Sequence, residues 1–204
     1  MMKRIGLMIV ATFISVASMM AQGYETSDIL VGFKGGPSYT TLTGLDGKYK
    51  IGGNLAAYIE VYLTDNLTMD IEFAYTMKGA KDAHSMADYA KLLDYNLDYF
   101  SATYLVKYYF NNKVGAYAGL NTAVLARGKV TDGSNTEDIR KYLHRGDFGP
   151  VIGAEYVFND KWTIDGRWMW SPRTISNSDF ARHNIGKTRN QTFTVTLGYK
   201  FQVF

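Results

Sequence analysis

The chain of 204 residues contains no cysteine, only three prolines and no apolar run of the ~20 residues that a membrane-spanning helix needs. Without cysteine it forms neither disulfides nor thiolate metal sites. The composition, with 20% charged residues, excludes a run of hydrophobic helices and is not that of a disordered chain. Glycine (20 residues) and aromatic side chains (15%) are abundant instead, which favours a sheet protein with many turns.

An excess of charge of one sign is also lacking. The formal net charge is +3, and two of the basic residues, Lys3 and Arg4, belong to a segment that we expect to be removed, which leaves about +1. Nucleic-acid binding domains are usually much more basic, so we expect no nucleic-acid partner. The length is that of a single domain.

The N-terminus has the pattern of an export signal. A positively charged start is followed by the apolar stretch 5–16, which has the length of a signal-peptide core, and then by the small residues Ala17, Ser18 and Ala21. We predict a signal peptide over residues 1–21 and an outer-membrane β-barrel domain over 22–204. Cleavage after Ala17 is an alternative, and so is an uncleaved membrane anchor, for which the apolar stretch is short.

Short and long breaks alternate along residues 29–204. The short ones are Thr64–Asn66, Asn111–Asn112 and Asn159–Asp160, and the long ones cover about 43–49, 79–95, 131–146 and 172–190. Eight segments with a period of two residues lie between them. An even number of strands, with tight turns at one end and long loops at the other, is typical of bacterial outer-membrane barrels, whose short turns face the periplasm.

The third segment shows most clearly which face meets lipid. One face is wholly apolar, with Leu67, Met69, Ile71, Phe73, Tyr75 and Met77; the other is largely polar, with Thr68, Asp70, Glu72, Thr76 and Lys78. By the same alternation the first segment places Phe33 and Tyr39 outward, and the fourth places Phe100, Val106 and Tyr108 outward. The fifth places inward Gly115, Tyr117, Gly119, Asn121 and Arg127.

Outward aromatic residues should form two girdles. We expect Phe110, Phe158, Trp162 and Phe201 at the periplasmic rim, and at the other rim Tyr39, Tyr75, Phe148, Trp168 and Trp170. Amphipathic rings prefer the headgroup zone of a bilayer. The alternative is a secreted barrel of lipocalin type, whose strands alternate with the apolar face inward.

The inward face carries charges of both signs. The basic residues are Lys34, Lys50, Lys78, Lys107, Arg127, Arg167 and Lys200, and the acidic ones are Glu60, Asp70, Glu72, Glu155 and Asp165. Eight strands enclose a space just wide enough for side chains to fill. Because unpaired charges there cost several kcal/mol each, we predict an ion-paired plug, with an ion or proton path as the alternative.

The long loops contain the few residues with candidate chemistry. Three histidines, His84, His144 and His183, have no paired metal-ligand spacing. Ser85 lies beside His84, with Asp82 and Asp88 nearby, which is the only local cluster with the residue types of an enzyme site. We predict no catalytic, cofactor-binding or metal-binding residues.

The last loop is basic. It contains Arg173, Arg182, His183, Lys187 and Arg189. Such a rim could bind the phosphates of lipopolysaccharide, the alternative being ordinary solvated loops.

Several stretches together resemble the PorT-like outer-membrane β-barrel family. They are Val31–Gly36, Tyr75–Ala80, Val106–Phe110, Asp147–Gly153 and Leu197–Phe201, in this order and spacing. The resemblance implies an eight-stranded antiparallel barrel similar to OmpX or the membrane part of OmpA. The last strand also resembles the C-terminal signal read by the barrel-assembly machinery, although Gln202, Val203 and Phe204 extend beyond its usual end.

These observations predict an all-β protein: an eight-stranded antiparallel up-and-down transmembrane β-barrel in the outer membrane of a Gram-negative bacterium. We expect a monomer that contacts outer-membrane lipids and has a structural or interaction role rather than an enzymatic one. A transport or protein-secretion component, as a narrow pore or a secretion-machine subunit, is the alternative.

Overall fold

The computed structural model describes residues 29–84, 91–133, 135–177 and 187–202. The expected signal peptide lies outside these residues. The strands are β1 Ile29–Thr43, β2 Lys48–Tyr62, β3 Leu67–His84, β4 Leu92–Tyr109, β5 Val114–Asp132, β6 Asn135–Asp138, β7 Gly146–Val157, β8 Trp162–Trp170 and β9 Arg189–Gln202. A short 3-10 helix, η1, covers Arg140–Tyr142. No helix in this part of the chain is long and apolar enough to cross a membrane.

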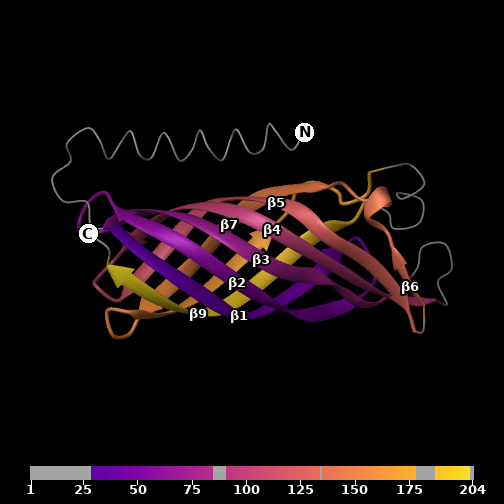
Figure 1. The fold of residues 1–204 in the computed structure, drawn as a ribbon, viewed down its shortest axis with the longest axis horizontal. Helices are drawn as coiled ribbons and strands as arrows, with labels where there is room; N and C mark the ends of the chain where they lie inside the picture. The colour runs from indigo at the N-terminus through magenta and orange to yellow at the C-terminus, as the bar shows by residue number, and fades with distance from the viewer. Residues whose placement is uncertain (1–28, 85–90, 134, 178–186, 203–204) are drawn as a thin grey trace.

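Eight of the strands close into an antiparallel barrel (Figure 1). Each strand pairs with the next one around the ring, β5 pairs with β7, and β1 closes the ring against β9. The remaining strand, β6, is short and pairs with the end of β5. Closure leaves no unpaired edge within the ring, which is the only way a sheet can span a bilayer. The predicted fold class is confirmed.

The two ends of the barrel differ as predicted. The turns after β2, β4 and β7 are tight, and Asn111 and Asn159 fasten two of them by accepting hydrogen bonds from backbone N–H groups. At the other end, β3 and β4 continue to His84 and from Leu92, and β5 with β6 reaches the far end of the molecule (Figure 1). We call these the turn end and the loop end.

Two predicted long loops are wrong in length. The break expected over 79–95 is shorter, because β3 continues to His84 and β4 begins at Leu92. The break expected over 43–49 is only the four-residue connection 44–47, because β1 pairs with β9 as far as Thr43 and β2 pairs with β3 as far as Lys48. Gly44 has φ of 100°, a conformation that suits glycine at a tight turn. Cross-strand hydrogen bonds have continued the sheet into residues whose polar, glycine-rich character indicated a loop.

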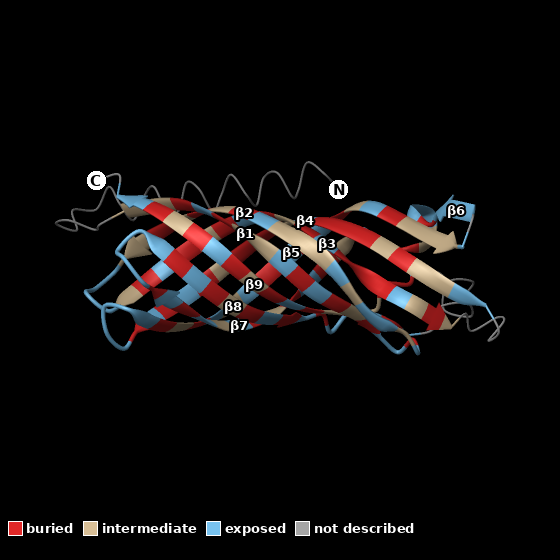
Figure 2. Ribbon diagram, turned by 90° about the horizontal axis from the view of Figure 1, so that it is seen from below, coloured by how far each residue is buried: buried red, intermediate tan, exposed pale blue. Residues whose placement is uncertain are grey.

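Apolar side chains point outward and polar ones inward along most of the barrel. Buried and exposed residues alternate along the strands (Figure 2), with Phe33 61% exposed and the neighbouring Lys34 4% exposed. Phe100, Val106 and Leu120 are likewise exposed on the outer wall. A wall this apolar needs lipid around it, so the lipocalin-type alternative, with its apolar face inward, is wrong.

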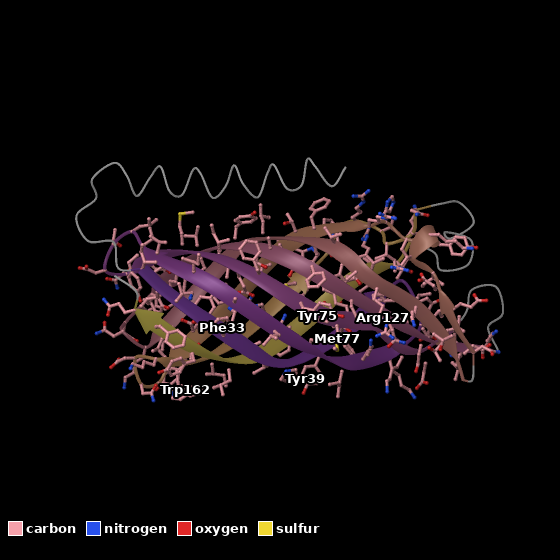
Figure 3. The ribbon with its side chains drawn as sticks, in the orientation of Figure 1. Phe33, Tyr39, Tyr75, Met77, Arg127 and Trp162 are labelled. Carbon is pink, nitrogen blue, oxygen red and sulfur yellow. The ribbon has the colours of Figure 1, made fainter. Side chains whose placement is uncertain are left out.

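Aromatic side chains gather at two levels of this wall. Near the turn end, Trp162 packs edge-on against Tyr199 with 4.9 Å between ring centroids. Farther along, Tyr75 packs on Phe100 at 5.0 Å and Trp168 stacks on Trp170 at 4.6 Å. Trp162 lies near the turn end, whereas Tyr75 lies near the middle of the long axis (Figure 3). The strands therefore extend well beyond the outer girdle, away from the turn end.

Candidate functional site

The interior near the turn end holds a cluster of three carboxylates and two ammonium groups, which we call the turn-side cluster: Glu60, Asp70, Lys107, Glu155 and Lys200. The Nζ atom of Lys107 lies 2.9 Å from carboxylate oxygens of both Glu60 and Asp70 and 3.2 Å from Glu155. Lys200 lies 4.0 Å from Glu60 and 3.9 Å from Glu155. All five are buried, so these charges rely on one another rather than on bulk water.

The next layer toward the loop end is the central cluster: Lys34, Glu72, Asp165 and Arg167. Arg167 makes two parallel hydrogen bonds to Glu72, of 2.7 and 3.0 Å, and its Nε donates to Asp165 at 3.0 Å. Lys34 completes it with a contact of 2.6 Å to Glu72. Two positive and two negative side chains balance here, in the bidentate geometry that makes Arg–carboxylate pairs strong.

Strand alternation explains why these layers stack in sequence order. Asp70, Glu72 and Lys78 occupy inward positions of β3 and follow one another from the turn end toward the loop end. Lys78 forms the loop-side pair with Asp147 at 3.7 Å. Asn190 donates to Asp147 at 2.9 Å and lies 3.1 Å from the hydroxyl of Tyr99. Inward positions of β3 thus contribute one charged residue to each of the three layers.

Glycines make room for the aromatic rings between these layers. Gly32 pairs with Tyr58 and Gly153 pairs with Tyr117 across neighbouring strands, and a Cβ atom on either glycine would overlap its partner's ring. The Tyr117 hydroxyl is therefore free to donate its hydrogen bond to Asp165.

Beyond the charged layers, toward the loop end, the interior is apolar, which the pattern of inward charges did not predict. This apolar cap consists of Leu42, Leu45, Ala80, Ala83, Tyr95, Leu97, Tyr99, Ala123, Leu125, Ile139, Leu143 and Ile175. The sequence did contain a signal for this apolar cap. Inward positions near the loop ends of the strands carry leucine, whereas inward positions in the membrane part carry charged residues. Leu143 comes from the connection between β6 and β7 and is tied down by a bridge to Ser176. Packed apolar side chains therefore fill this part of the interior.

One predicted inward charge is wrong. Arg127 lies on the outer wall with its side chain 56% exposed, 3.9 Å from Asp98, whose carboxylate also accepts a hydrogen bond from Tyr75 (Figure 3). The cause is a β-bulge: Tyr99 pairs with Leu125 but Asp98 pairs with Arg127, so Ala126 is an extra residue in β5. An extra residue exchanges the two faces for everything beyond it.

The other predicted inward charges are confirmed. Lys50 is half-buried and donates to the carbonyl oxygen of Lys78 at 3.0 Å. The remaining ones are buried in the three layers described above.

Among the residues with candidate chemistry, those that the structure describes do not gather into a site. His84 ends β3, and His144 lies 3.2 Å from a guanidinium nitrogen of Arg173. Ser85, Asp88 and His183 lie outside the described residues. In the described ranges there is no group of three or more histidine or acidic side chains able to hold a metal ion.

Exposed ion pairs also lie at the loop end. Lys48 donates a hydrogen bond of 2.8 Å to Asp82, and this bond holds the pKa of the Asp82 carboxyl below its ordinary value. The hydrogen bond from Arg140 has the same effect on the pKa of Asp138. Both pairs are in open solvent, where they contribute little to stability.

Part of the predicted basic rim can be placed. Arg173, Lys187 and Arg189 are exposed at the loop end of β8 and β9, whereas Arg182 and His183 lie outside the described residues. Beside Arg189 the outer wall is hollowed by a groove of about 290 Å³, which includes Thr43, Trp168 and Trp170. Most of its lining residues are exposed on the outer wall, and the buried residues Ser171 and Asn190 complete the lining.

A closed antiparallel ring with an apolar outer wall, two aromatic levels and a charged interior defines an outer-membrane β-barrel. Residues 20–176 match the family model described as "Outer membrane protein beta-barrel domain", and the chain belongs to this family. It is accordingly a protein of the Gram-negative outer membrane. None of the curated proteins compared with the chain is a significant match in sequence.

Solved structures agree on the fold. The attachment invasion locus protein Ail of Yersinia pestis, in complex with the heparin analogue sucrose octasulfate, superposes with a TM-score of 0.52 at 15% identity, covering 85% of this chain and 99% of Ail. Neisserial surface protein A has a TM-score of 0.51 at 12% identity, covering 87% of this chain and 100% of that one. At such identities the likeness concerns the fold alone.

Proposed function

We propose that this protein is a non-conducting, non-enzymatic outer-membrane barrel that carries its outer loops on a rigid, ion-paired scaffold, in a structural or interaction role. The observation that carries the proposal is the filled interior. Lys107 lies within 3.2 Å of three carboxylates, and Arg167 is held by two more. A permeating ion would have to separate such pairs, and uncompensated buried charges cost several kcal/mol each.

The apolar cap supports the same proposal from the other end. Leu97 and Leu143 are fully buried within it. Hydrated ions avoid a packed apolar constriction, because nothing there replaces their water.

Transport or protein secretion is the alternative function, and one observation favours it. At the turn end a hollow of about 300 Å³ reaches inward to Tyr109 and Lys200, between the tight turns. Such a vestibule could be the entrance of a narrow pore. It meets the turn-side cluster, however, which is why we favour the closed interior.

No reactive site is assembled among the residues that the structure describes, which supports a non-enzymatic role. Asp82, the carboxylate nearest His84 in sequence, is engaged by Lys48. We expect the lipid A of cells carrying a His84→Ala variant to be unchanged by mass spectrometry relative to cells with the unaltered chain.

Further assignments rest on the sequence. We infer that residues 1–21 are an export signal, that the chain belongs to the PorT-like group of barrels, and that the barrel-assembly machinery reads its last strand. We also infer a monomer, because the ring is closed by β1 against β9. The basic residues at the loop end favour lipopolysaccharide phosphates as a partner.

Planar-bilayer recording at neutral pH tests the proposal. The mature protein, shown to be folded by a difference in gel migration between boiled and unboiled samples, should produce no steady open level. A reproducible open level in the unaltered chain would contradict the closed interior and favour the pore alternative. The gel control ensures that a silent recording reflects a folded barrel.

A further inference from the structure

The groove beside Arg189 lies where the membrane wall ends. It is formed by the loop end of β8 and the start of β9, with Thr43 of β1 at its other side, and has a volume of about 290 Å³. Trp168 and Trp170 line it with their rings stacked at 25° to each other. Both indoles remain more than one third exposed, so their surface is available to a ligand.

The chemistry of the wall changes in steps along this groove. Strand register aligns Trp168 with Phe193, then Trp170 with Gln191, and then Thr43 with Arg189. From the membrane outward the order is therefore aromatic hydrocarbon, amide beside indole, and guanidinium. A lipid molecule standing against the wall presents the same order: acyl chain, polar headgroup with hydrogen-bonding groups, and phosphate.

Arg189 is suited to an external anion. Within the described ranges no carboxylate lies within ion-pair distance of its guanidinium, whereas Arg127, another outward arginine, faces Asp98 at 3.9 Å. Exposed Lys187 and Arg173 lie in the same connection between β8 and β9 and add positive charge. Arginine binds phosphate through several donors at once, which favours it over a single point charge.

We propose that this groove binds the phosphorylated sugar headgroup of an outer-leaflet lipid, the chemistry of lipid A. Arg189 binds the phosphate, Gln191 hydrogen-bonds the sugar, and the indole of Trp170 packs against the sugar ring. Trp168 and Phe193 contact the acyl chain below. This inference rests on the membrane assignment and on the loop end facing outward, and it deepens the lipopolysaccharide partner named above.

The charge pattern favours a lipid over a soluble anion. The part of the groove at Trp168 and Phe193 is apolar, and a free phosphate bound at Arg189 would leave it uncovered. A headgroup with attached acyl chains covers both the apolar part and the part at Arg189. A sugar is favoured over a plain glycerol phosphate because stacked indoles and an amide offer a flat apolar surface next to hydrogen-bonding groups.

The tryptophans provide the assay. The chain has only three, and Trp162 lies at the turn-end girdle, so a Trp162→Phe background leaves both remaining indoles in the groove. This protein, folded in detergent micelles, is titrated with bisphosphorylated lipid A while indole emission is followed. We expect a saturable change. Removing a charge-assisted contact with Arg189→Gln should raise the Kd about tenfold or more.

Two controls match this experiment. Arg127→Gln removes an outward arginine from the opposite part of the rim and should leave the Kd within about twofold, since Arg127 already faces Asp98. Dephosphorylated lipid A, titrated into the protein with no substitution at Arg189, should bind about tenfold more weakly, and this control does not depend on the folding of a variant.

Several outcomes would overturn the inference. They are a change that does not saturate, equal binding by Arg189→Gln, equal binding of dephosphorylated lipid A, equal binding of phosphatidylglycerol, and displacement by millimolar inorganic phosphate. A negative result in the lipid A titration does not affect the proposal tested by the bilayer recording, because the groove lies on the outer wall and the proposed closed interior lies within the ring. A conducting barrel could equally retain the lipid site, so the two proposals fail separately.

Discussion

Lys107 is the main positive partner of the three buried carboxylates in the turn-side cluster. Its ammonium contacts Glu60, Asp70 and Glu155, and only Lys200 stands near as a second positive charge. We predict that Lys107→Met, which keeps the length of the side chain, destabilises the barrel by about 3–5 kcal/mol, because it leaves buried carboxylates without their main partner. Urea-induced unfolding of the protein in lipid vesicles measures this loss.

Lys48→Met is the matched control for this prediction. Lys48 also makes an ion pair, with Asp82 at 2.8 Å, but both side chains are largely exposed. Water replaces the lost contact at little cost, so the midpoint of unfolding should hardly move. If Lys107→Met were equally neutral, the turn-side cluster would not contribute to stability and the ion-paired scaffold would be wrong.

Among the strands, β5 offers a test of how a bulge sets the faces of the barrel. Ala126 is the extra residue opposite Asp98 and Tyr99, so its deletion leaves Leu125 inward and Arg127 outward. We predict that the chain without Ala126 still folds and migrates differently when boiled and unboiled. Deleting Ala118, which lies in a regular stretch of the same strand, has no such compensation.

Deleting Ala118 would turn inward residues of β5 to the wrong face in one of two ways. Either Tyr117 or the pair Asn121 and Leu125 must turn from the interior to the lipid face, because one missing residue exchanges the faces of a strand. We expect this variant to give little heat-modifiable barrel in the same gel. Equal folding of both deletions would show that the register of β5 is loosely determined.

For the whole molecule, the direction in which the barrel crosses the membrane is the property on which both proposals depend. The chain has no cysteine, so single-cysteine variants carry one label each. Thr136→Cys in β6 should react with a membrane-impermeant maleimide on intact cells. Lys113→Cys, in the turn between β4 and β5, should react only after the outer membrane is permeabilised. The opposite pattern would place the lipid groove on the periplasmic side and exclude a ligand of the outer leaflet.

Much of the fold could be predicted from local pattern. Over residues 67–78 of β3 the period-two alternation placed the outward and inward residues correctly, because a strand between lipid and a charged interior has strong and opposite preferences on its two faces. The prediction failed where that contrast fades. At the loop end the interior becomes apolar, so neither the bulge at Ala126 nor the continuation of β1 to Thr43 had a signal in the alternation.

The candidate site was less accessible from sequence. The inward charges were identified as a set, but their partners were not: Arg167 binds Glu72, 95 residues away, and Lys107 binds Glu60, 47 residues away. Arg189 was recognised only as one of several basic loop residues. Its place beside Trp168 and Trp170 depends on the register of β9 against both β1 and β8.

The amino-acid sequence by itself determined the number of strands in the ring, the two faces of their regular stretches and the membrane address, because these follow from the order of apolar and polar residues along a locally extended chain. The tertiary structure alone decided which charges meet, where Ala126 shifts the faces, which apolar residues pack together at the loop end and where the wall is hollowed at Arg189. These features depend on register and on closure of the ring, which bring together residues from opposite ends of the chain.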